Sequence, residues 1–179
     1  MRTALILVLV LLPAAARAQH GPVPLSEMEE EKIRDAAYDP ALRVATFQAI
    51  IETRVKRLQD ILANTRAQGR REDIQQNMQE IAGLANELED NLVDYDKAHR
   101  DLRKPLPKLS DAILRWESVL KQPPDDAGYN LTRKLALDAV ADLKDDAKEM
   151  LPAEQAYFKE HPPDKNANPG GVGEINPRR

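Results

Sequence analysis

The chain has 179 residues, a formal net charge of −4 and no cysteine. The lack of cysteine excludes disulfides, thiol nucleophiles and zinc sites that need cysteine ligands. The acidic excess makes nucleic acid an unexpected partner, because a polyanion is repelled by a surface of its own sign. The length suits one domain of ordinary size.

Residues 1–18 are predicted to form a secretory signal peptide. Arg2 precedes the apolar run ALILVLVLL, and Ala16 and Ala18 satisfy the small-x-small rule of signal peptidase. The run falls short of the roughly 20 residues of a membrane-spanning helix, so no stable membrane anchor is expected after cleavage. Cleavage after Ala18 removes Arg2 and Arg17, and leaves 161 residues with 24 basic and 30 acidic side chains, net −6. We therefore expect a periplasmic or secreted protein.

A proline-punctuated linker, residues 19–25, is predicted to precede a helical bundle domain over residues 26–160. The first helix is short and begins at Ser26. Its hydroxyl can accept a hydrogen bond from the amide of Glu29, whose side chain reaches back in a capping box. Because this segment is rich in charge, we expect its helix to pack loosely.

The next helix is predicted from Pro40 to about Gln68. Asp39 supplies the N-cap, and proline is favoured at the first helical position. Its apolar residues recur at steps of three and four: Val44, Phe47, Ile51, Val55, Leu58 and Leu62. Gly69 is expected to end this helix, with Arg66 well placed beside the negative end of the helix dipole.

The following helix carries a sustained heptad pattern, typical of a coiled coil. Its seam consists of Ile74, Met78, Ile81, Ala85, Leu88, Leu92, Tyr95, His99 and Leu102. The pattern predicts a long antiparallel hairpin with the preceding helix. Apolar flanks at Ala82, Leu84 and Val93 leave two arrangements open. Later helices of the same chain cover the flanks in the one that we prefer, and a homodimer buries this helix in the other.

Two more helices are predicted after the break at Pro105 and Pro107. The first presents Leu106, Leu109, Ile113, Trp116 and Leu120 on one face, which makes Trp116 a core residue. The second is predicted from about Asn130 to Met150, with Pro152 expected to kink or end it. Its core stripe consists of Ala136, Val140, Leu143, Ala147 and Met150, and Leu135 and Leu137 are expected to flank it.

Residues 161–179 have the composition of a disordered tail. No strand pattern appears anywhere in the sequence. The predicted fold class is therefore all-α, an antiparallel helical bundle of three to four main helices with a long heptad-patterned helical hairpin.

The stretch ELEDNLVDYDKAH places five carboxylates and a histidine between Glu87 and His99. The heptad seam turns most of the carboxylates to water, so a solvated face is the preferred interpretation. Asp96 and His99 lie three residues apart, on one side of a helix, as in the Glu-x-x-His element of di-iron bundles. Such a centre needs a second half-site, but His20 falls in the linker and His161 in the tail. Asp96 and His99 are therefore weak candidate metal ligands. The preferred role of His99 is a hydrogen bond to a neighbour at the end of the seam.

A second acidic row consists of Asp138, Asp142, Asp145 and Asp146. Like charges four residues apart on a helix repel each other, although Lys134 and Lys144 can relieve part of the repulsion. A weak calcium or magnesium site is an alternative, but a regular helix lacks the enclosing loop of a calcium site.

No catalytic or phosphate-binding motif is present, so we expect neither enzymatic activity nor a cofactor. The leading hypothesis is an exported, non-enzymatic helical protein that acts by protein–protein interaction, as a scaffold or chaperone, on a partner that the sequence does not identify. Small exported helical chaperones share this size, but their LTxxQ signature is absent, since Leu135 follows LTRK in place of glutamine. The alternative is a metal-binding helical-bundle protein or enzyme that uses Asp96 and His99.

Overall fold

The computed structural model describes residues 24–162. The predicted signal peptide and residues 163–179 of the predicted tail lie outside this range. The described residues form five helices and no strand, which confirms the all-α class. The helices are α1 (Glu27–Asp35), α2 (Pro40–Ala63), α3 (Arg70–Lys97), α4 (Pro105–Leu120) and α5 (Asn130–Glu160).

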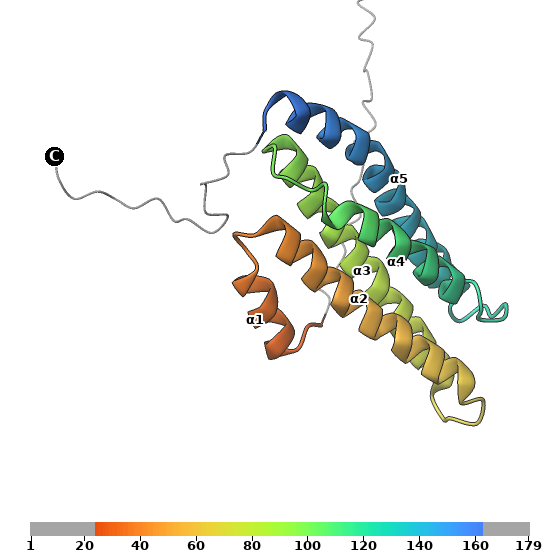
Figure 1. Ribbon diagram of the computed structural model, residues 1–179. Coiled ribbons are helices and arrows are strands. Elements are labelled where there is room, and N and C mark those ends of the chain that lie inside the picture. The colour runs from red at the N-terminus through yellow and green to blue at the C-terminus, as the bar shows by residue number, and fades with distance from the viewer. Residues whose placement is uncertain (1–23, 163–179) are drawn as a thin grey trace, which may run out of the picture.

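Helices α2 to α5 form a bundle of two hairpins that lie side by side (Figure 1). Helix α2 packs on α3 and α4 on α5, while α2 also contacts α4 and α3 also contacts α5. Both hairpin turns lie at one end of the bundle, where Arg71 Nε pairs with Asp126 Oδ2 at 3.2 Å. Residues 98–104 join the hairpins at the opposite end, which we call the crossover end. The apolar flanks of α3 are thus covered within the chain by α2 and α5.

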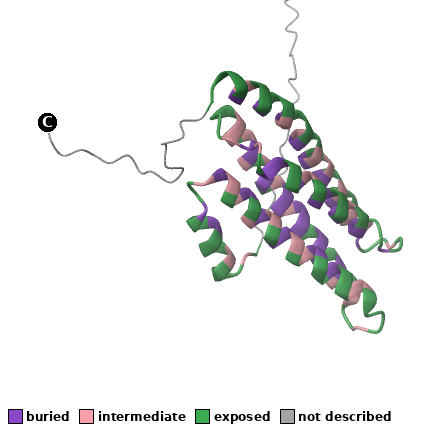
Figure 2. Ribbon diagram, viewed as in Figure 1, coloured by how far each residue is buried: buried purple, intermediate pink, exposed green. Residues whose placement is uncertain are grey.

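The core lies between the two hairpins, as the buried positions in Figure 2 show. The heptad residues of α3 from Ile74 to Leu92 are all fully buried, as the seam predicts. Trp116 is fully buried as well, and its indole Nε1 donates a hydrogen bond of 2.6 Å to Glu52 Oε2. A buried tryptophan usually finds such an acceptor, because the cost of burying an unsatisfied N–H is high.

Helix α1 begins with the predicted capping box: Glu29 N donates to Ser26 Oγ at 3.3 Å, and Ser26 N donates to Glu29 Oε2 at 2.9 Å. Ile33 is the one residue within α1 that is buried, and Arg54 of α2 anchors this helix. The Arg54 guanidinium donates to both oxygens of Glu29, at 2.7 and 2.9 Å, and to Glu80 Oε2 of α3 at 2.7 Å. The hydrogen bonds from Arg54 lower the pKa of Glu29 to about 2, against the opposing effect of burial.

Helix α2 ends at Ala63, so the prediction that it reaches Gln68 is wrong. The guanidinium of Arg70 donates to the carbonyls of Ile61 at 3.1 Å and Leu62 at 3.2 Å. These bonds satisfy last-turn carbonyls that lack a partner within the helix, so the chain can leave the helix early. Gly69 does adopt a positive φ of 70°, but it does so as the N-cap of α3.

The ends of α3 and α5 also differ from the prediction. Helix α3 stops at Lys97, and only Leu102 of the last two predicted seam residues is buried. Helix α5 continues past Met150 and Pro152 to Glu160. Proline removes one backbone hydrogen bond, and the burial of Phe158 beyond it holds the helix together. In Figure 1 the last part of α5 curves over the crossover end.

Candidate functional site

Asp96 and His99 do not share a helix face. Asp96 lies in the last turn of α3, whereas His99 lies beyond the helix with a left-handed φ of 51° and is exposed. The imidazole of His99 stacks on the ring of Tyr157, with ring centroids 4.1 Å apart and planes 10° from parallel. His161 also stacks on Tyr157, at 4.5 Å. The spacing argument for a half-site failed because it assumed that the helix continues through His99, whereas α3 ends at Lys97.

Asp96 instead faces α5 across a depression of about 200 Å³. The depression is lined by Asp96, Asp146, Glu149, Met150 and Ala153. Glu89 lies about two helical turns before Asp96 on α3 and extends the row of carboxylates. Burial raises the pKa of Glu89, and the charges of Asp146 and Asp142 raise it further. Burial likewise raises the pKa of Asp146, with added repulsion from Glu149 and Asp142. The carboxylates of α3 and α5 thus repel one another across this interface.

The solvent-exposed side of α5 extends this acidic surface with a single row of residues along the helix. The core stripe of α5 is buried as predicted, so the opposite side of the helix faces water. That side carries an outer stripe of six exposed residues at steps of 4, 3, 4, 3 and 4: Leu131, Leu135, Asp138, Asp142, Asp145 and Glu149. Leu131 is 71% and Leu135 47% exposed. The outer stripe therefore joins an apolar pair to four carboxylates.

Basic side chains neutralise only the start of this acidic row. Lys134 Nζ pairs with Asp138 Oδ2 at 2.6 Å, but Lys144 turns to α4 and pairs with Glu117 Oε1 at 3.2 Å. Within residues 24–162, no ion pair involves Asp142, Asp145, Asp146, Glu149, Glu89 or Asp96. The charge of this face is thus left for solvent or for a partner to balance.

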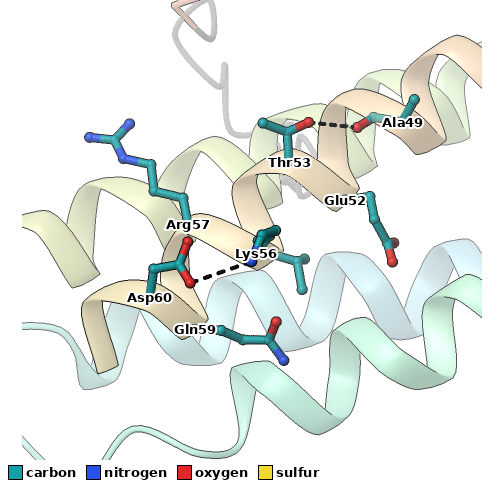
Figure 3. Close-up of a pocket in the computed structure, with 8 residues that line it drawn as sticks. Ala49, Glu52, Thr53, Lys56, Arg57, Gln59 and Asp60 are labelled. Carbon is teal, nitrogen blue, oxygen red and sulfur yellow. Dashed lines mark hydrogen bonds and ion pairs between the residues drawn. The ribbon is translucent and has the colours of Figure 1, made fainter. Parts of the chain in front are cut away.

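Two other depressions are lined in part by side chains that already bond to their neighbours in the fold. Figure 3 shows one of about 620 Å³ on α2, whose eight lining residues all come from this single helix. There Lys56 pairs with Asp60 at 3.5 Å, and Thr53 Oγ1 donates to the carbonyl of Ala49. The other, of about 290 Å³, lies at the crossover end beside Tyr38 and Tyr95. Arg57 and Gln59 line the depression on α2 but point in different directions in Figure 3, so their polar groups do not converge as they do in a typical ligand site.

The sequence prediction found the acidic residues of this face but not its geometry. Leu135 was expected to flank the core, yet it lies in the outer stripe beside Leu131. The steps of 4, 3, 4, 3 and 4 were available in the sequence. The period alone does not distinguish the outer stripe from the core, because the buried stripe of the same helix has the same period. Glu89 and Asp96 lie near the carboxylates of α5 because α3 packs on α5, and a sequence pattern within one helix does not show this proximity.

No three histidine, aspartate or glutamate side chains of the described residues are grouped so that they could hold a metal ion. None of the described helices is long and apolar enough to cross a membrane. Comparison with protein-family models, curated proteins and solved structures finds no match to this chain.

Proposed function

We propose that this chain is an exported, non-enzymatic helical protein that binds another protein through the outer stripe of α5. The observation that carries the proposal is the stripe itself, in which two exposed leucines lie in line with three carboxylates that have no ion pair within residues 24–162. Apolar groups gathered on a surface are typical of interaction sites. Like charges without counter-charges destabilise the free protein, and a cationic partner relieves that repulsion.

A binding role suits the rest of the molecule. The apolar core is filled by side chains of the helices. The guanidinium groups of Arg54 and Arg70 form hydrogen bonds between helices. Export follows from the predicted signal peptide and places the protein in the periplasm or outside the cell. A long, rigid helical face supports a scaffold or chaperone role better than it supports catalysis, which needs converging groups in a cleft.

A photo-cross-linking experiment in the native host tests the proposal. A photoreactive phenylalanine derivative replaces Leu135 in one variant and Leu114, an exposed leucine of α4, in the matched control. We expect a discrete protein adduct, identified by mass spectrometry, at position 135 and none at position 114. Equal adducts at both positions, or none at either, would contradict binding through the outer stripe.

A further inference from the structure

We infer that the partner segment is an amphipathic helix in which apolar residues are followed by lysine or arginine at heptad spacing, and that it packs lengthwise along the outer stripe of α5. This inference rests on the proposed function and specifies the chemistry of the partner. It is carried by the spacing, the length and the charge of the stripe.

The spacing favours a helix as the occupant. The six stripe residues follow the 4, 3 rhythm that lets two helices pack at a shallow crossing angle. From Leu131 to Glu149 the stripe is roughly 27 Å long at about 1.5 Å per residue, which is five turns of helix. An extended peptide is disfavoured because the described part of the chain has no strand edge to which it could add.

The order of residues along the stripe sets which end of the partner is apolar and which end is cationic. Its apolar residues meet Leu131 and Leu135 near the turn end, and its cationic residues meet Asp142, Asp145 and Glu149. Lys134 is the one lysine that pairs with a stripe carboxylate, and it leaves these three carboxylates unpaired among the described residues. Asp146 and Glu149 border the depression that also contains Asp96, which broadens the negative potential that attracts a cation.

A second copy of this chain is a poor occupant. In a two-fold dimer through this face the stripe meets itself: parallel helices set all the carboxylates against one another, whereas antiparallel helices set Asp138 of one copy against Asp142 of the other and the remaining carboxylates against leucine, without any counter-charge. Such like-charge juxtaposition opposes association. The partner is therefore a different protein segment, with the opposite charge.

The test uses the mature protein and a labelled synthetic helix of about 20 residues, with leucines at its first heptad positions and lysines at the later ones. Fluorescence anisotropy measures binding. We expect saturable one-to-one binding that weakens by at least about tenfold when salt rises from about 50 to about 300 mM, because screening reduces the charge attraction. A scrambled peptide of equal composition and a peptide with glutamate in place of lysine should bind at least about tenfold more weakly.

Variants of the protein locate the site. The pair Asp142→Lys and Glu149→Lys should weaken binding by at least about tenfold. The matched control, Glu31→Lys with Asp60→Lys, makes the same change of net charge at exposed positions of α1 and α2 and should leave binding within about twofold. Leu131→Ser with Leu135→Ser should also weaken it, whereas Leu114→Ser should not. Because all these residues are exposed, the variants should keep the helical circular dichroism spectrum of the parent.

Two results would overturn the inference: equal binding of the scrambled peptide, or equal loss of binding in the Glu31/Asp60 control. A protein adduct at position 135 together with no binding of the lysine peptide also overturns it, while the proposed function stands. The absence of an adduct at position 135 is evidence against the proposed function itself. The two failures are thus distinguishable.

Discussion

Glu154 is the least exposed carboxylate among the described residues, at 2%. Its Oε2 accepts a hydrogen bond of 3.1 Å from the amide of Leu102 and so ties α5 to the crossover segment. Burial raises the pKa of Glu154, the bond from Leu102 opposes this, and the nearby charges of Asp101 and Asp96 raise it further. A carboxyl whose pKa is raised by folding stabilises the protein in its protonated form, and this contribution is lost as the pH rises through the folded-state pKa.

We therefore predict that Glu154→Gln is more stable than the parent at pH 7, by on the order of 1 kcal/mol. The side-chain oxygen of glutamine can accept the hydrogen bond from the Leu102 amide, and it carries no charge that must be buried. The advantage should vanish as the pH falls below the ordinary glutamate pKa of about 4. Thermal unfolding followed by circular dichroism from pH 7 to pH 4 measures the difference. Glu160→Gln, at an exposed position of the same helix, is the control. A Glu154→Gln variant that is less stable at pH 7 would refute the argument.

At the scale of elements, the helix interiors and the starts of α1, α2 and α5 were predictable from the sequence, whereas the C-terminal ends of α2, α3 and α5 were not. The interior of α3 follows its heptad pattern because burial against α2 and α5 selects that period. The ends depend on contacts between elements: Arg70 reaches back to α2, and the ring of His99 stacks on Tyr157 of α5. The same limit applies to the candidate site, whose α5 residues lie in one local pattern but whose α3 contribution comes from packing.

Helix α1 is attached by the Arg54 network, by a hydrogen bond of 3.0 Å from Arg43 to the carbonyl of Ile33 and by the burial of Ile33. The contribution of the Arg54 network can be tested separately. The pKa of Glu29 is lowered from an ordinary 4.5 to about 2. A carboxyl with a lowered folded-state pKa contributes stability above its ordinary pKa, and that contribution is lost as the pH falls towards 2. We predict that Glu29→Gln lowers the free energy of local opening of α1 by about 2 kcal/mol at neutral pH, because Arg54 loses its bidentate carboxylate partner.

Hydrogen exchange followed by mass spectrometry measures this local opening. Amides of α1 should exchange faster in Glu29→Gln, while those of α3 and α5 keep the protection of the parent. Glu31→Gln, which removes an exposed carboxylate from the same helix, should leave α1 protected. Uniformly faster exchange in all helices would instead show that the Arg54 network supports the whole bundle.

At the scale of the whole molecule, the helices of one chain bury the apolar core against one another, while Leu131 and Leu135 of the outer stripe stay exposed. The wide apolar face of α3 was compatible with a homodimer, but α2 and α5 cover it within one chain. The outer stripe of α5 opposes self-association by charge repulsion. Both features favour a monomer.

Native mass spectrometry of the protein purified from its own host without chelators tests this description. We predict a monomer whose mass equals the bare chain of 161 residues that remains after cleavage behind Ala18. No bound metal is expected, because Asp96 lies on α3 and faces α5, whereas His99 stacks on Tyr157. A stoichiometric mass excess equal to one or two metal ions would restore the metal-binding alternative, and its loss in His99→Ala would assign the ligand. A dimer peak that persists on dilution would contradict the prediction of a monomer.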